Sequence, residues 1–307
     1  MTNYVIPILL TILTWWFSTG LILWLGRTRH EIHMPIMIAA TGLAIIAFLV
    51  LFLTSQSTMA NAYFAFFAAI ILWGWHELSF IFGMITGPRR TECPTTNSWT
   101  LRFKSATESI LYHEIGLLLT GFVIAFLTLE SANKIALYTF AVLWVMRISA
   151  KLNLFFGVPH IAVSMMPKRL AYLASYFRQG TISLFFPGSV TAAILAFAAL
   201  VFLILSSEHS QTSVGLVLVT TLLALAIFEH WCLIIPFDET AIWATWFKNK
   251  ATKTLGSAGE PAKNQSRLLV DKFDKHPWDN EQRQSVESSN NELKRPLANL
   301  CINTGRG

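Results

Sequence analysis

Ionisable residues stand inside stretches of this sequence that are otherwise strongly apolar, and they are the positions where the chain could do chemistry. They form three histidine–glutamate pairs and one basic group: His76–Glu77, His113–Glu114, Glu229–His230, and Arg147 with Lys151 and Asn153. A charge inside hydrocarbon is costly unless it is paired or hydrated, so such residues are retained for a structural or a functional reason. The residue types leave three interpretations open.

The first interpretation is a buried polar network that needs no ligand. Glu77, Glu114 and Glu229 supply negative charge, and Arg147 and Lys151 supply positive charge. The two basic residues are four positions apart, so they share one face of a helix. Paired charges and interhelical hydrogen bonds of this kind fix how membrane helices pack against one another.

The second interpretation is a pigment site, and the third is a metal site. A neutral imidazole of His76, His113 or His230 could ligate the magnesium of a chlorophyll or the iron of a haem. Three glutamates and three histidines could also hold a redox or hydrolytic metal. Bundle metal sites use Glu-x-x-His, which places both side chains on one face. Here Glu and His are adjacent and point about 100° apart, so a metal would need ligands from several helices.

The sequence also lacks the common signatures of enzymes. It has no P-loop, no G-x-G-x-x-G pattern, no G-x-S-x-G pattern and no H-E-x-x-H pair. A non-enzymatic role is therefore favoured. A metal-dependent membrane enzyme remains the alternative.

The composition identifies the elements that must position these residues. Hydrophobic residues make up 54% of the 307 positions and charged residues only 13%, against about 25% charged residues in soluble domains. A chain of this kind is a multi-pass membrane protein, expected to be an all-α helix bundle. The net charge of +6 is distributed over loops, so we expect no nucleic-acid partner.

Seven stretches are long and apolar enough to cross a bilayer as helices. They lie at about 4–25, 35–54, 61–86, 109–129, 135–157, 182–205 and 213–236. Together they form a predicted transmembrane domain over residues 1–250. Residues 251–307 are rich in Lys, Asn, Ser, Glu and Asp and predict a disordered cytoplasmic tail.

Basic residues assign the two sides of the membrane. Lys and Arg occur in the loops after the first, third and fifth stretches and after the seventh, while the opposite loops carry only Lys134. The positive-inside rule therefore predicts a periplasmic N-terminus and a cytoplasmic C-terminus. In this topology the three glutamates, Arg147 and Lys151 lie on the order of 8–14 Å inside the cytoplasmic boundary. We therefore expect one polar cluster in the cytoplasmic leaflet.

Several long strings in the sequence resemble the PuhE-type family. They are WWFSTG (15–20), WGWHELSFIFGMITGPRRTECP (73–94), ILYHE (110–114), LWVMRISAKLNLFFGV (143–158), YLASYF (172–177), FPGSVTAA (186–193) and EHW (229–231). The resemblance runs from about residue 1 to 248. Members of this family are described as photosynthetic complex assembly proteins of purple phototrophic bacteria.

The resemblance implies a role and a place in the cell. It implies a factor that assembles the reaction centre with its core light-harvesting complex, or that supplies bacteriochlorophyll or a precursor to them. The expected partners are reaction-centre or light-harvesting subunits and the lipid bilayer. The expected location is the bacterial cytoplasmic or intracytoplasmic membrane. The family supplies no catalytic or ligand residues to carry over to this chain.

Overall fold

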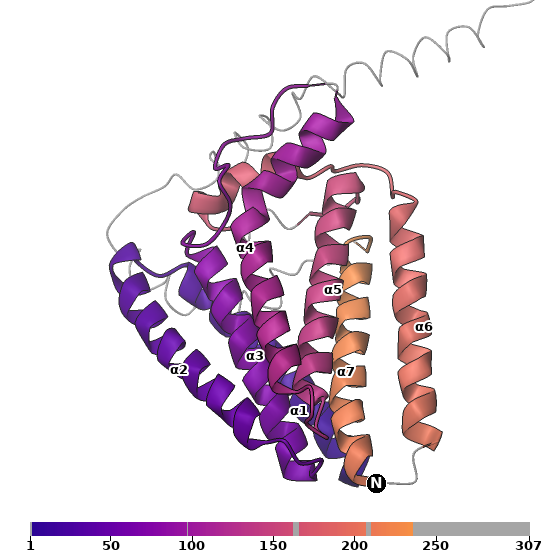
Figure 1. Ribbon diagram of the computed structural model, residues 1–307. Helices are drawn as coiled ribbons and strands as arrows, with labels where there is room; N and C mark the ends of the chain where they lie inside the picture. The colour runs from indigo at the N-terminus through magenta and orange to yellow at the C-terminus, as the bar shows by residue number, and fades with distance from the viewer. Residues whose placement is uncertain (1, 97, 162–165, 207–209, 236–307) are drawn as a thin grey trace, which may run out of the picture. The chain divides into compact units, whose positions relative to one another are not determined.

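The computed structural model describes residues 2–96, 98–161, 166–206 and 210–235 (Figure 1). The chain divides into two compact units, residues 1–245 and 246–307, and every described residue belongs to the first. The tail predicted at 251–307 lies outside the described residues. Within the described ranges the secondary structure is helical, apart from one isolated bridge between Val158 and Gln179.

Seven long α-helices cross the described unit, and each is apolar and long enough to cross a membrane. Their bounds are α1 Thr2–Gly26, α2 His33–Leu53, α3 Met59–Ile81, α4 Trp99–Leu127, α5 Ile135–Phe156, α6 Phe185–Ser206 and α7 Ser210–Cys232. The prediction of an all-α bundle with seven spanning helices is confirmed. Two shorter 3₁₀ helices, His30–Ile32 (η1) and Lys168–Tyr176 (η3), stand between them.

Helices α3 and α4 do not coincide with the apolar stretches predicted for them. The helix expected over 109–129 begins ten residues earlier, because Ser98 accepts a hydrogen bond from the Leu101 N–H and caps the helix there. The helix expected over 61–86 ends at Ile81, and Gly83 follows with a φ of 70°, a conformation that glycine adopts easily. Hydropathy marks only the apolar part of α4, and after α3 it continues through apolar loop residues.

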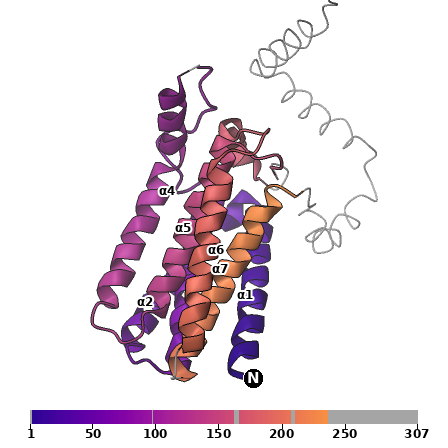
Figure 2. The same cartoon turned by 90° about the vertical axis from the view of Figure 1, so that its right-hand side faces the viewer.

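Helix α3 is the centre of the bundle and packs against α1, α2, α4, α5 and α7. Small residues on α3 let its neighbours approach closely, and Ala65, Ala69 and the large Phe66 are all buried. Helix α4 packs on α3 and α5, while α1 packs on α7 and α3. Figure 2 shows α4 at one side of the bundle and α1 at the other. One face of α4 therefore remains uncovered by the described helices.

The loop between α3 and α4 and the short helix η3 lie at one end of the bundle (Figure 1). The His113 N–H on α4 donates to the Thr86 carbonyl of this loop at 2.9 Å. A Cβ on Gly87 would lie 2.0 Å from the Glu108 carbonyl, so only glycine fits that approach. The loop is joined to η3 by the Arg89 Nε, which donates to the Tyr176 hydroxyl at 2.9 Å.

Candidate functional site

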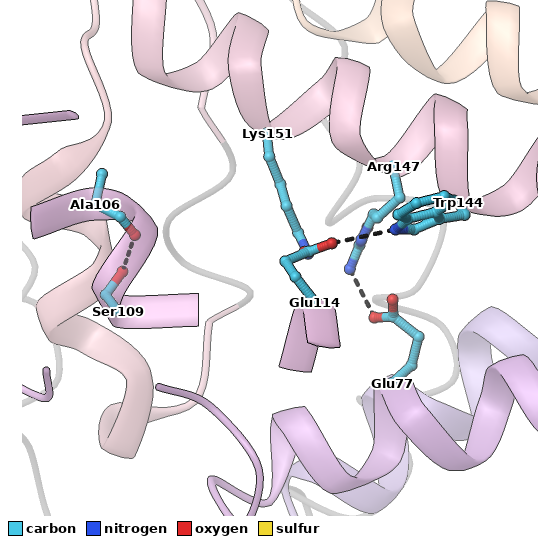
Figure 3. A network of polar contacts seen from close by, with 7 residues as sticks. All are labelled: Glu77, Ala106, Ser109, Glu114, Trp144, Arg147 and Lys151. Carbon is cyan, nitrogen blue, oxygen red and sulfur yellow. Dashed lines mark hydrogen bonds and ion pairs between the residues drawn. The ribbon is translucent and has the colours of Figure 1, made fainter. Parts of the chain in front are cut away.

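Two ion pairs connect α3 and α4 to α5 within the bundle. Arg147 Nη2 lies 2.7 Å from Glu77 Oε2, and Lys151 Nζ lies 2.5 Å from Glu114 Oε1. The Trp144 indole N–H donates to the other oxygen of Glu114 at 3.3 Å. Figure 3 shows these α5 side chains directed at the two carboxylates. We call these five residues the polar cluster.

Helix geometry explains why one helix can hold both carboxylates. Trp144, Arg147 and Lys151 stand at i, i+3 and i+7 of α5, so their side chains share one stripe. Glu77 lies near the end of α3, and Glu114 lies in the middle of α4. Each helix adjacent to this stripe therefore contributes one carboxylate to one cation.

The two ion pairs differ in how deeply they lie. The Glu77 side chain is 7% exposed and Arg147 is 45% exposed, whereas Glu114 and Lys151 are each 21% exposed. The second carboxylate oxygen of Glu77 is buried with no hydrogen-bond partner. A buried carboxylate depends strongly on its cation, because removing one partner leaves an uncompensated charge.

Glu229 extends the electrostatic field of the cluster to α1 and α7. Its Oε1 accepts a hydrogen bond from the Trp15 indole N–H at 2.8 Å, which joins α7 to α1. The charge of Arg147 interacts with those of Glu229 and Glu114 as well as with that of Glu77. The described helices thus bring all three predicted glutamates into the field of one guanidinium.

Two of the predicted histidines meet between α3 and α4. The rings of His76 and His113 lie 6.3 Å apart, and Phe80 contacts the His113 ring at 4.6 Å. The Nε2 of His76 is 2.7 Å from the Thr120 hydroxyl. The Nδ1 of His76 and both ring nitrogens of His113 are buried with no hydrogen-bond partner. Such groups are uncommon in folded proteins and call for an explanation.

His230 and Asn153 make different connections. The Nδ1 of His230 lies 2.8 Å from the Ala226 carbonyl, and its Nε2 lies 2.9 Å from the Ser149 hydroxyl. Since a carbonyl only accepts, Nδ1 carries the proton and Nε2 accepts from the hydroxyl. Asn153 donates through Nδ2 to Ser189 at 3.1 Å, which links α5 to α6. Both nitrogens of His230 are therefore already used within the protein.

Each adjacent His–Glu pair serves two different neighbours. On α3, Glu77 contacts α5 while His76 contacts α4. On α4, Glu114 contacts α5 while His113 contacts α3. This divergence follows from the 100° between successive helical residues. Among the residues that the structure describes, no three His, Cys, Asp or Glu side chains come together as metal ligands.

The donor chemistry of the histidine pair suits a tetrapyrrole, but the packing around it does not. A neutral imidazole nitrogen is the usual ligand for a tetrapyrrole metal. His113 is only 1% exposed and His76 only 4%. A Cβ on Gly116 would lie 3.2 Å from His76 Cε1, so the ring already fills the space between α3 and α4. In this arrangement the macrocycle has no room beside the nitrogens.

Some residues of the site were not among the predicted ones. Trp15 donates a hydrogen bond to the Glu229 carboxylate, and the Thr120 hydroxyl is bonded to the His76 imidazole. Both partners are far away in the sequence. Thr120 stands four residues after Gly116 and seven after His113, a spacing that marks one face of α4. No sequence spacing indicates the role of Trp15, because it lies on α1 and its partner Glu229 lies on α7.

Comparisons with known proteins give one family and one curated relative. The family model described as "Protein of unknown function (DUF3623)" matches residues 1–254. The chain is 36% identical over 266 residues to the "Uncharacterized 30.4 kDa protein in puhA 5'region" of Rhodobacter capsulatus. The aligned region covers 85% of this chain and 97% of that protein. No solved structure matches the chain.

Proposed function

The chain belongs to the DUF3623 family, and on that premise we propose that it is a non-enzymatic, membrane-embedded assembly factor for the photosynthetic reaction centre and its core light-harvesting complex. The relative from Rhodobacter capsulatus is described by its position in the puhA 5' region. The long strings shared with PuhE-type assembly proteins support the same context. The proposal places the chain in the bacterial cytoplasmic or intracytoplasmic membrane.

The structural observation that carries the proposal is the distribution of charged and apolar side chains. Charged side chains within the helices form ion pairs between helices, and the outer faces of the bundle expose large apolar side chains. Glu77 and Glu114 are each paired with a cation of α5. The uncovered face of α4 instead carries Leu119, Phe122 and Phe126. A bundle whose charges stabilise its own packing, with apolar side chains outside, is suited to hold partner helices in the bilayer.

A photo-crosslinker on these faces tests the proposal. Phe126 on α4, Phe52 on α2 and Phe202 on α6 are exposed, so a benzophenone analogue of phenylalanine replaces each with little loss of packing. Irradiation during complex formation should yield adducts to reaction-centre or core-antenna subunits from at least one of the three faces. The control is the same variant in cells grown with the complex repressed. Identical adducts under both conditions would contradict a role in assembly.

A second candidate function is bacteriochlorophyll handling by His76 and His113, favoured by their three buried nitrogens without partners. When bound, the pigment would supply a central magnesium to which an imidazole nitrogen is a ligand. All three nitrogens are enclosed where α3 packs against α4, so this function requires α4 to separate from α3.

An absorption spectrum tests this second function. The protein is purified in mild detergent from its host, and pigment is extracted and quantified. Bacteriochlorophyll or a precursor at near-stoichiometric amount, lost in the His76→Leu/His113→Leu double variant, is the expected result. His160→Leu, which changes a histidine outside the helices, should keep the pigment. Protein free of pigment would leave both histidines a purely structural role.

A further inference from the structure

A cavity of about 730 Å³ opens where α1 and α3 end, beside η3 and the α3–α4 loop. Its lining includes four cationic side chains from three separate segments: Arg27 after α1, Arg90 in the α3–α4 loop, and Lys168 and Arg169 at the start of η3. None of the lining residues is an aspartate or a glutamate. These segments are the loops that the positive-inside rule assigns to the cytoplasm. The cavity therefore gathers positive charge at the membrane boundary.

Arg169 is held at this cavity by neutral groups. Its guanidinium donates to the Gly26 carbonyl at 3.2 Å, to the Phe82 carbonyl at 3.3 Å and to the Nδ1 of His33 at 2.8 Å. A Cβ on Gly83 would lie 3.3 Å from the Arg169 Cδ, so this glycine makes room for the side chain. Partial burial of the guanidinium lowers the pKa of Arg169. These contacts position the guanidinium, and within the described part of the chain no carboxylate forms an ion pair with it.

Two hydroxyl groups of the cavity lining are also unsatisfied. The Thr86 Oγ1 and the Tyr172 Oη are buried and have no hydrogen-bond partner. Thr86 is 1% exposed and comes from the α3–α4 loop, whereas Tyr172 comes from η3. Buried hydroxyls in folded proteins are nearly always bonded. These two unsatisfied hydroxyls of lining residues are an observation independent of the basic side chains, and a hydroxyl is a donor to an anionic oxygen.

We propose that this cavity binds a phosphate group. Phosphate offers several acceptor oxygens and negative charge, which match two hydroxyl donors and several cationic donors. Two sources carry this chemistry at a cytoplasmic membrane boundary: the headgroup of an anionic phospholipid and a soluble phosphate ester or ion. Basic pockets between transmembrane helices on this side of a membrane are known to bind phospholipid headgroups.

The test measures thermal unfolding of the full chain in mild detergent, followed by tryptophan fluorescence. One titration adds inorganic phosphate, with chloride at the same ionic strength as the reference. The other adds phosphatidylglycerol to the micelles, with phosphatidylcholine as the reference. A saturable rise in the unfolding midpoint with at least one phosphate-bearing probe is expected. A rise with phosphatidylglycerol alone identifies a lipid site, and a rise with inorganic phosphate as well identifies a site for soluble phosphate.

A pair of double variants assigns the binding to the cavity. Arg90 and Lys168 are exposed lining residues, so Arg90→Gln/Lys168→Gln should fold and should weaken binding by at least about tenfold. Lys104→Gln/Arg178→Gln removes the same charge outside the lining and should bind as the wild type does. The proposal would be overturned if neither probe shifted the unfolding midpoint of the wild type. It would also be overturned if the cavity variant bound as tightly as the wild type, or if the control variant lost as much binding as the cavity variant.

Discussion

At the scale of single residues, the polar cluster is a set of charges paired across helices. Glu77 and Glu114 each have one cation on α5, and the indole of Trp144 adds a hydrogen bond to Glu114. Desolvating two charges costs about as much as their attraction returns. The cluster is therefore expected to determine which helix faces meet, more than to add stability overall.

Replacing one member of an ion pair should destabilise the protein far more than replacing both members. Lys151→Met leaves the Glu114 carboxylate without its cation and should destabilise the bundle by on the order of 3 kcal/mol. Adding Glu114→Gln should recover most of the lost stability, because the partly buried carboxylate is then no longer charged. The measurement is the midpoint of thermal unfolding in detergent for the two single variants and the double variant.

Lys104→Met provides the matched control, because Lys104 pairs with Glu108 at 3.9 Å in an exposed position. An exposed pair contributes at most about 1 kcal/mol. Equal losses from Lys151→Met and Lys104→Met would show that the α4–α5 pair has no special role.

The membership of this cluster could be predicted from sequence more readily than its pairing. Ionisable residues inside apolar helices, at one depth, indicate a common layer. Which carboxylate meets which cation depends on the rotation and order of the helices. Glu229 illustrates the difference: its charge interacts with that of Arg147, as the sequence predicts, and it also accepts a hydrogen bond from Trp15 on α1. Composition and spacing carry no information about that contact.

At the scale of elements, the α3–α4 loop controls how α4 sits on the bundle. The loop carbonyl of Thr86 accepts from the His113 N–H, and the backbone at Gly87 passes directly over α4. Helix α3 ends at Ile81, and the loop that follows contains Gly83, Gly87 and Pro88. The close approach of Gly87 to α4 was not predictable, because it arises only in the packed structure.

Gly87→Ala should loosen this loop from α4. The added Cβ would meet the Glu108 carbonyl at 2.0 Å, so the backbone must move. We expect a loss of about 1–3 kcal/mol and faster thiol labelling of Cys93, whose N–H is bonded to Ser175 of η3. Thermal unfolding and labelling kinetics measure the two effects.

Gly42→Ala is the control for this change. Nothing lies within 4 Å of a Cβ at Gly42, inside α2. Helix propensity then predicts a neutral or slightly stabilising effect, up to about 1 kcal/mol. Unchanged unfolding and unchanged Cys93 labelling in Gly87→Ala would refute the role given to the loop.

At the scale of the whole molecule, seven crossings place the two ends of the helical unit on opposite sides of a membrane. Their number was predictable because each crossing needs a long apolar stretch. The central position of α3 was not, since it follows from small residues such as Ala65 and Ala69 facing several neighbours. Hydropathy does not identify the central helix, because the central α3 is less apolar than the peripheral α2.

The distribution of basic residues predicts the orientation. Alkaline phosphatase is active only in the periplasm, so a fusion after Lys134 should be active and one after Arg90 inactive. A green fluorescent protein fused after Gly307 should fluoresce, as it does in the cytoplasm. The reverse pattern would place the polar cluster and the basic cavity at the periplasmic side and would contradict the topology.

The most direct measurement for the assembly role is the amount of reaction centre and core antenna in a strain that lacks this chain. Near-infrared absorption of membranes quantifies both complexes, with transcripts of their subunits measured alongside. We predict that both complexes fall several-fold at unchanged transcript levels, and that the wild-type chain restores them. Complexes at normal levels and with normal assembly rates in the deletion strain would contradict the proposed function.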